Sequence, residues 1–422
     1  MSLELRNKTV TIVGLGRSGV ASAELVLRCG ARVKVSDVAP TQKTRPLIQG
    51  LAFKDKVLLE SGGHTRSFIE DSDLVVVSPG VRSDAEALTW AREKNIPVLG
   101  EIELAWQFCP CPVIAVTGSN GKTTTTTLIA EILKAAGRNV CLCGNIGSPF
   151  TKYVLDLKPS DLVALEVSSF QMETITTFRP HVAVFLNFSQ NHLDRHKDLD
   201  EYFNAKSQIF MNQTSDDFAV LDHAEPRHHE LARKLKAQVL FYNQPGRCDA
   251  AIENPNHLAA LAACEALGVP AATARKVFAA FKGVEHRQEF VRTVEGVDYV
   301  NDSKSTTVEA GRLAMTLARK PLIFICGGRN KHLDFSSLRP LAKDKVKKMI
   351  VIGEAREELK SVFSDVVALD EGCSLEDAVS KARAGAQPGD CVILSPMCAS
   401  FDMFDNFEHR GKEFKRIVGE LI

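Results

Sequence analysis

The chain has 422 residues, which is longer than one hydrophobic core usually grows, so we expect two to four domains and favour three. Its 52 basic residues balance its 52 acidic residues, and the pI near 7.1 argues against a nucleic-acid or acidic-membrane partner. The first eight residues lack a charged and then apolar leader, and no apolar run approaches membrane-spanning length. We therefore expect a cytoplasmic protein with no membrane insertion.

Strand-like and helix-like segments alternate along the chain, which predicts an α/β fold with parallel sheets and helices on their faces. The first unit contains KTVTIVG, ARVKVSD and DLVVVSPG, and it ends at a proline-rich stretch near Cys109. The second contains CPVIAVTG, DLVALE and HVAVFLN, which are apolar enough for strands buried on both faces. Two helical stretches, NHLAALAACEALG and VFAAFKGVEHR, lead to a third unit with VDYVND, PLIFICGG, KKMIVIG and DCVILSP.

The first unit carries a glycine pattern that is typical of dinucleotide binding. Gly14-x-Gly16-x-x-Gly19 follows a strand, and Asp37 ends the next strand at the spacing of a ribose-binding acid. Alone, this pattern predicts an NAD-dependent dehydrogenase. However, the pattern indicates only that a diphosphate-sized anion binds near the start of a helix. It does not show that the protein transfers a hydride.

The second unit contains a strand, a glycine-rich loop and a helix in the segment VIAVTGSNGKTTTTTLIAEI. Glycines let backbone N–H groups approach phosphates, Lys122 can neutralise phosphate oxygens, and Thr123 can bind Mg²⁺. Only two residues separate the glycines instead of four, so we interpret the segment as a shortened phosphate loop, with a structural turn as the alternative. We expect the later threonines mainly to form hydroxyl contacts in the first turn of the helix and to pack against its neighbours. The expected ATP contacts here are Gly118, Ser119, Asn120, Gly121, Lys122, Thr123 and Thr124.

Two polar residues follow neighbouring strands of this unit. Glu166 ends DLVALE and His192 follows HVAVFLN, so we expect both at the sheet edge that carries the phosphate loop. A carboxylate and an imidazole beside a magnesium triphosphate can serve as metal ligands. With a second nucleotide site in the first unit, the pattern indicates a nucleotide-linked substrate together with ATP.

The eleven cysteines are odd in number and lie mostly in apolar contexts, which favours reduced core thiols over disulfides. Cys109-Pro-Cys111 and Cys141-Leu-Cys143 have no second CxxC-type partner that would complete a zinc site. We interpret both pairs as structural.

Several segments together resemble the Mur ligase family over nearly the whole chain: TGSNGKTT, LEVSSFQME, NHLDRH, AKSQIF, EHR, NDSKSTT and SPMCASFDMFDNFEHRG. GLGRSG and NDSKSTT resemble the branch that adds D-glutamate to UDP-N-acetylmuramoyl-L-alanine. The resemblance implies an ATP-dependent, amide-forming ligase of peptidoglycan precursor synthesis that works through an acyl phosphate. It implies a Rossmann-like UDP-sugar domain at 1–109, a central P-loop ATPase-like domain at 110–284 and a Rossmann-like amino-acid domain at 285–422.

The same resemblance connects the enzyme with cell wall biogenesis, cell shape and cell division, and we expect a monomer. An NAD-dependent dehydrogenase and a non-catalytic nucleotide-binding regulator are the alternatives. The presence of a complete set of metal-binding residues argues against a non-catalytic regulator.

The resemblance also assigns roles to individual residues. Lys122, Glu166, His192 and Lys206 would be catalytic; two Mg²⁺ ions would be held by Thr123, Glu166, His192 and a carbamate on Lys206. Further ATP contacts would be Asn256, Arg287, Asp302 and Lys304; UDP-sugar contacts Ser18, Asp37, Ser78, Gly80 and Asn145; and D-glutamate contacts Thr306, Lys331, Ser400, Phe401 and Phe407. Two departures stand out: IENPNH keeps only Asn256 of the family's adenine pattern, and Arg329 stands where related enzymes often carry an acid.

Overall fold

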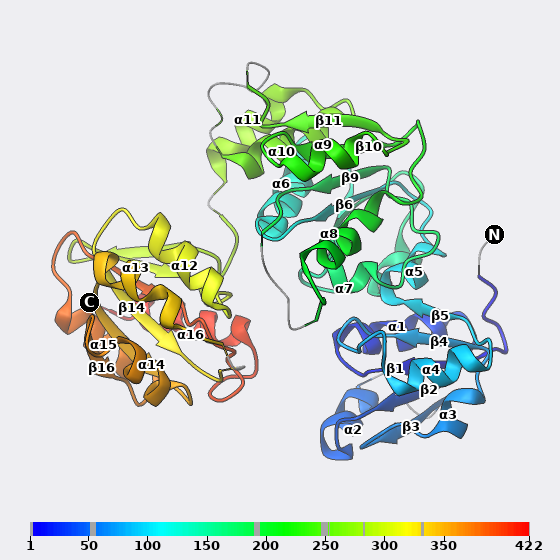
Figure 1. Cartoon of the computed structure of the whole chain (residues 1–422), viewed down its shortest axis with the longest axis horizontal. Coiled ribbons are helices and arrows are strands. Elements are labelled where there is room, and N and C mark those ends of the chain that lie inside the picture. The colour runs from blue at the N-terminus through cyan, green and yellow to red at the C-terminus, as the bar shows by residue number, and fades with distance from the viewer. Residues whose placement is uncertain are drawn as a thin grey trace. The chain divides into compact units, whose positions relative to one another are not determined.

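The computed structural model describes residues 3–50, 56–189, 195–245, 252, 254–281, 283–330 and 333–421. The chain forms three sheets with helices between their strands, which confirms the predicted α/β class (Figure 1). Its contacts divide it into two compact units, Met1–Phe281 and Lys282–Ile422, and the first unit contains two of the sheets. The domain limits at 109 and 284 stay predictions.

The first sheet is parallel and has the strand order β3-β2-β1-β4-β5. Alternate residues of its strands face opposite layers: α1 and α5 share a core cluster with one face, and α3 and α4 share a cluster with the other. The bounds are β1 Thr9–Val13, α1 Arg17–Arg28, β2 Arg32–Asp37, α2 Thr41–Gln49, β3 Val57–Ser61, α3 Arg66–Glu70, β4 Leu74–Val77, α4 Glu86–Glu93, β5 Val98–Gly100 and α5 Glu101–Trp106.

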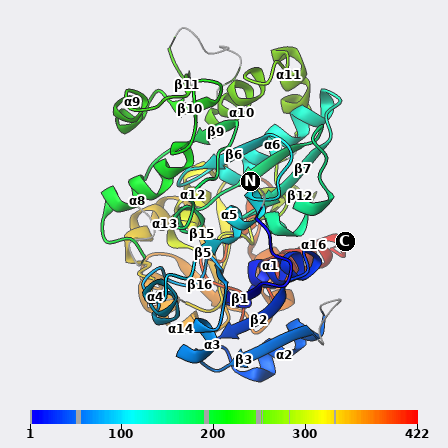
Figure 2. The ribbon, with the colours of Figure 1, turned by 90° about the vertical axis from the view of Figure 1, so that its right-hand side faces the viewer.

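The second sheet is also parallel, with the order β11-β10-β9-β6-β8-β7. The succession β11, β10, β9 and β6 can be followed in Figure 2. Helices α6, α10 and α11 cover one face, and the other face continues the core of the first sheet. The bounds are β6 Val113–Thr117, α6 Lys122–Ala135, β7 Val140–Gly144, η2 Phe150–Lys152, η3 Val154–Asp156, β8 Leu162–Glu166, α7 Ser169–Met172, β9 Val182–Phe185, α8 Leu199–Ser207, η4 Gln208–Phe210, β10 Phe218–Asp222, α9 Pro226–Ala232, β11 Gln238–Tyr242, α10 Pro255–Glu265 and α11 Ala271–Ala280.

The third sheet has the order β12-β13-β17-β14-β15-β16 and is parallel except for the hairpin of β12 and β13. The bounds are β12 Glu289–Val294, β13 Val297–Asn301, α12 Val308–Leu317, β14 Leu322–Gly327, η5 Ser336–Leu338, α13 Arg339–Lys345, β15 Val346–Ile352, α14 Arg356–Phe363, β16 Ala368–Glu371, α15 Leu375–Gly385, β17 Cys391–Leu394 and α16 Phe407–Gly419. In register, Leu394 lies opposite both Asn301 and Ile325, so the residues that follow β13, β14 and β17 meet at one edge.

The helical interpretation of VFAAFKGVEHR is wrong beyond its first residues. Helix α11 ends at Ala280, and both His286 and Gln288 have positive φ, at 63° and 47°. Such backbone angles are incompatible with a right-handed helix. The helix therefore ends before the connection between the two units, although apolar residues continue into it.

Within the described ranges, no helix combines the length and the apolar character that crossing a membrane requires.

The start of α1 lies very close to the end of β1. A Cβ atom added to Gly19 would lie 2.0 Å from the carbonyl oxygen of Gly14, whereas a Cβ on Gly16 would have no atom within 4 Å. The third glycine of the first-unit pattern therefore permits a close contact between helix and strand.

This contact predicts a difference between two matched variants. Gly19→Ala should lower the free energy of unfolding by about 1–3 kcal/mol or more, because the backbone has to shift to admit a methyl group. Gly16→Ala should change it by less than about 0.5 kcal/mol. Urea unfolding of the two variants measures the difference, and equal losses would contradict the packing argument.

Candidate functional site

The predicted phosphate loop connects β6 to α6. Strand β6 ends at Thr117 and helix α6 begins at Lys122. Gly118 and Gly121 have φ values of 146° and 81°, which side-chain-bearing residues rarely adopt. The loop therefore has the backbone that the sequence predicts, and it opens directly into a helix N-terminus, where backbone N–H groups favour anions.

The side chain of Lys122 folds over this loop. Its Nζ donates hydrogen bonds to the carbonyl oxygens of Gly118 and Ser119, at 2.9 and 3.0 Å. The Ser119 hydroxyl donates to the carbonyl oxygen of Ser189 at 3.1 Å and so ties the loop to the segment after β9. The ammonium is therefore held where it can meet a phosphate oxygen.

The carboxylate of Glu166, at the end of β8, connects two segments of the site. It is 1% exposed and accepts hydrogen bonds from the Thr123 hydroxyl and the Asn145 side-chain amide, each at 2.7 Å. The backbone N–H of Asn145 also donates to the Glu166 carbonyl oxygen at 2.9 Å. One buried carboxylate thus joins the first turn of α6 to the loop after β7.

Lys206 of α8 is 1% exposed and reaches the same loop. Its Nζ donates to the Gly118 carbonyl oxygen at 2.9 Å and lies 4.5 Å from the centre of the Tyr202 ring. Burial lowers the pKa of Lys206 well below its usual value, Lys122 lowers this pKa further, and Glu166 opposes the shift. The neutral amine, which is a nucleophile, is therefore easier to form at Lys206 than at an exposed lysine.

Asn256 and His192 are the two other residues predicted for this site. Asn256 lies against the phosphate loop, because a Cβ on Gly121 would lie 2.2 Å from its Oδ1. The Thr125 hydroxyl also lies 3.4 Å from that oxygen. His192 lies outside the described residues.

A cavity of about 420 Å³ lies beside the glycine pattern of the first sheet. Its lining includes the five residues predicted for the UDP-sugar: Ser18, Asp37, Ser78, Gly80 and Asn145. Since Asn145 donates to Glu166, which also accepts from Thr123, two hydrogen bonds connect a residue of this cavity to the start of α6.

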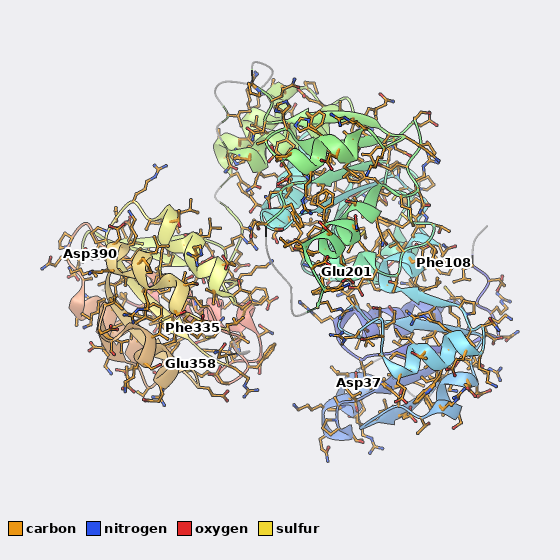
Figure 3. All side chains as sticks on the ribbon, viewed as in Figure 1. Asp37, Phe108, Glu201, Phe335, Glu358 and Asp390 are labelled. Atoms are coloured by element: carbon orange, nitrogen blue, oxygen red, sulfur yellow. The ribbon has the colours of Figure 1, made fainter. Side chains whose placement is uncertain are left out.

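Two of these residues support the loop between β1 and α1. The Asp37 carboxylate, labelled in Figure 3, accepts hydrogen bonds from the backbone N–H groups of Leu15 and Ala39. The Ser78 hydroxyl donates to the Gly14 carbonyl oxygen at 2.6 Å. Sequence reasoning missed Val38, which lines the cavity and is 70% exposed, although its position next to Asp37 was a usable signal.

The unit Lys282–Ile422 holds a second polar cluster at the edge of its sheet. Asp302 is 5% exposed and accepts hydrogen bonds from the Gln288 backbone at 3.1 Å and the Ser395 hydroxyl at 3.0 Å. Burial raises the pKa of Asp302 to about 6, and the nearby Arg287 partly offsets this rise. The Lys304 ammonium lies 5.8 Å from the centre of the Phe407 ring.

The structure describes four of the five residues predicted for D-glutamate. Ser400 is buried, Phe401 is 59% exposed, and Thr306 is half-buried in the segment after β13. The Phe407 carbonyl oxygen accepts a hydrogen bond from Ser303 at 2.8 Å. Lys331 lies outside the described residues.

Arg329 does not add an unbalanced positive charge. Its Nε and Nη2 atoms each donate to a Glu354 carboxylate oxygen at 2.8 Å, and both side chains are about half exposed. The two side chains of this two-pronged pair together carry no net charge.

Arg410 of α16 is a residue that sequence reasoning missed. It is 1% exposed, and its guanidinium donates to the Ser303 hydroxyl and carbonyl oxygens, both at 3.0 Å, and to the Cys398 carbonyl oxygen at 3.2 Å. Burial lowers its pKa to about 10. An arginine in an amphipathic helix usually faces solvent, so only its place within FEHRG signalled this role.

The two nucleotide-type loops and the strand-end polar residues define a class: an α/β protein that binds a nucleotide-linked ligand beside a phosphate-loop site. Family models match the chain over residues 8–100 (Mur ligase MurD-like, N-terminal domain), 116–258 (Mur ligase middle domain) and 286–398 (Mur ligase, glutamate ligase domain). The chain belongs to the Mur ligase family.

Curated relatives support this membership over the full length. The chain is 38% identical to the UDP-N-acetylmuramoylalanine--D-glutamate ligase of Koribacter versatilis, with 99% of each chain covered. It is 40% identical to the protein of the same name from Geotalea uraniireducens, again with 99% of each covered.

Solved structures support the fold. UDP-N-acetylmuramate-alanine ligase MurC from Thermotoga maritima is similar with a TM-score of 0.61 at 17% identity, over 98% of this chain and 99% of that one. MurF ligase from the same organism, in complex with ADP, has a TM-score of 0.60 at 18% identity, over 99% of this chain and 96% of that one.

The buried Asp302 predicts a pH dependence of stability. Its pKa of about 6 exceeds the ordinary value of 3.8, so between about pH 4 and 6 the folded state keeps a proton that the unfolded state releases. The wild type should therefore lose stability relative to Asp302→Asn as the pH rises through this window, by at most about 3 kcal/mol, with no further change above it. Urea unfolding of both proteins from pH 4 to 8 measures this, and a constant difference would contradict the assignment.

Proposed function

We propose that this chain is an ATP-dependent ligase that joins D-glutamate to UDP-N-acetylmuramoyl-L-alanine in peptidoglycan precursor synthesis. The observation that carries the proposal is the position of Asn145, which lines the 420 Å³ cavity and also bonds Glu166 beside the phosphate loop. A UDP-linked substrate in the cavity would thus extend toward a bound triphosphate. The names of the curated relatives support the same substrates.

The chemistry begins with a poor electrophile. The carboxylate of the L-alanine residue attacks the γ-phosphorus of ATP and gives an acyl phosphate and ADP. The amine of D-glutamate then attacks the acyl carbon, an amide forms, a proton is released, and inorganic phosphate leaves. The role of Lys122 is to hold the γ-phosphate and stabilise the charge that develops on it, which fits its place over the loop.

The donor set beside the loop fits magnesium. The Glu166 carboxylate and the Thr123 hydroxyl are hard oxygen donors at the start of α6, and a buried carboxylate is stabilised by a nearby cation. We propose that these residues, together with His192 and Lys206, hold two Mg²⁺ ions. The bound ions would neutralise phosphate charge as it builds up.

The proposal includes a carbamate on Lys206. The lowered pKa of Lys206 favours the neutral amine, which adds to the carbon of CO₂ and releases one proton. The product is an anionic oxygen donor in place of a cation that would repel a metal. The buried position of the amine at the phosphate loop supports this role.

The remaining assignments follow the resemblance. In the unit Lys282–Ile422, Arg287, Asp302 and Lys304 would contact ATP, and Thr306, Lys331, Ser400, Phe401 and Phe407 would contact D-glutamate. We propose domain limits at 109 and 284 and a cytoplasmic monomer whose activity bears on cell shape and cell division.

An assay of ATP-dependent phosphate release tests the proposal directly. Release should require both UDP-N-acetylmuramoyl-L-alanine and D-glutamate, and L-glutamate, L-lysine and diaminopimelate should not replace D-glutamate. A parallel titration should show binding of the UDP-sugar and none of NAD. Tight NAD binding without UDP-sugar binding would favour a dehydrogenase instead.

Lys122→Ala should lower turnover by at least about 100-fold, because the ammonium stabilises the charge on the transferred phosphate. Lys134 is exposed in the last turn of the same helix, where its Nζ donates a hydrogen bond to the half-exposed Glu131. Lys134→Ala is therefore a matched control. It should keep near-normal turnover. The phosphate-release assay measures both, and near-normal activity of a folded Lys122→Ala protein would refute the ATP site.

Lys206→Ala should likewise lose most activity, and short carboxylic acids such as acetate should restore part of it by replacing the carbamate oxygens. The same acids should not rescue Lys122→Ala, which lacks a cation. Activity of both variants over a series of acid concentrations measures this. Equal rescue of both, or of neither, would argue against the carbamate.

A further inference from the structure

The two CxC pairs lie on the same face of the second sheet. Cys111 and Cys143 belong to one core cluster, and Cys109 and Cys141 pack against it. All four are reduced. The second sheet therefore brings near one another two pairs that are 30 residues apart in the sequence.

The register separates the pairs into two independent dithiols. Cys141 lies opposite Val163, and Val163 lies opposite Val113, two residues after Cys111. Strand β8 thus lies between the pairs and places them about 10 Å apart, since neighbouring strands are about 4.8 Å apart. In the described part of the chain, no three thiols lie within 4.8 Å of one another, so a four-cysteine metal centre is not formed.

The pair before β6 has the geometry of a reactive dithiol. The Sγ atoms of Cys109 and Cys111 are 3.8 Å apart, and the intervening Pro110 is exposed. Cys109 is partly exposed, whereas Cys111 is 5% exposed. A partly exposed cysteine therefore lies in contact with a buried one, as in a dithiol with an attacking and a resolving member.

The pKa directions agree with these two roles. The contact between the two thiols lowers the pKa of Cys109, and the same contact, together with burial, raises the pKa of Cys111. Both directions favour a thiolate on Cys109 over one on Cys111.

The pair in β7 has the same pKa directions, lowered for Cys141 and raised for Cys143, so what distinguishes it is its backbone. Cys141 and Cys143 are alternate residues of a regular strand, so their side chains stand parallel on Cα atoms about 6.6 Å apart. A disulfide between them would bend a strand that is held by β8. Cys109 and Cys111 lie outside any strand, between α5 and β6, and Figure 3 labels Phe108, the residue directly before them.

We propose that Cys109 and Cys111 form a redox-sensitive dithiol that closes to an intramolecular disulfide by exchange with low-molecular-weight disulfides. The Cys109 thiolate attacks one sulfur of the small disulfide, a mixed disulfide forms, and one small thiolate leaves. Cys111, on losing its proton, then attacks the Cys109 sulfur and releases the second small thiolate. The two protein thiols are oxidised by two electrons, and one small disulfide is reduced to two thiols.

The chain offers an internal comparison for the test. Trypsin releases residues 95–122, which contain only Cys109 and Cys111, and residues 139–152, which contain only Cys141 and Cys143. The folded full-length protein is equilibrated with oxidised glutathione, then unfolded in the presence of iodoacetamide so that buried thiols also react, digested and analysed by mass spectrometry. Peptide 95–122 should lose two hydrogens and escape alkylation, reversibly with dithiothreitol, while peptide 139–152 should carry two alkyl groups.

Two variants assign the roles within the pair. Cys111→Ser should accumulate a glutathione adduct on Cys109, because the resolving thiol is gone, and Cys109→Ser should leave Cys111 without an adduct. Wild-type peptide 95–122 with two alkyl groups under oxidising conditions would overturn the proposal. So would a disulfide that links the two peptides, or an adduct on Cys111 in Cys109→Ser.

Discussion

The site in the unit Met1–Phe281 depends on one buried carboxylate. A carboxylate is costly to bury unless hydrogen bonds or cations meet it, and Glu166 is met by the Thr123 hydroxyl and the Asn145 amide. These two donors come from opposite sides of β8, one from the start of α6 and one from the loop after β7. This single side chain therefore connects the helix that follows the phosphate loop with a residue that lines the 420 Å³ cavity.

Both units contain buried ionisable groups that form hydrogen bonds with uncharged oxygen atoms. Lys206 donates to a carbonyl oxygen, Asp302 accepts from a serine hydroxyl, and Arg410 donates to the hydroxyl and carbonyl oxygens of two residues. Such partners satisfy hydrogen bonds without cancelling charge, so each group remains able to respond to a charged ligand or a proton. This is the electrostatic character expected of sites that handle several phosphates and carboxylates.

Local patterns predicted the parts of the fold that depend on nearby residues. The phosphate loop, the strands that end at Glu166 and Asp37, and the α/β class could all be derived from alternating apolar segments and glycine spacing. The sequence did not reveal the Asn145–Glu166 bond or the common face of the CxC pairs, because both depend on the strand order. Arg410 was missed because its burial depends on residues more than 100 positions away.

The pair of Arg329 and Glu354 shows how neighbouring strand ends can neutralise each other's charge. Position 329 follows β14, and Glu354 follows the adjacent β15, so a cation at one strand end meets an anion at the next. Together the two side chains carry no net charge. A comparison made position by position along the sequence would record only a positive charge at 329, whereas in space that charge is paired across two strands.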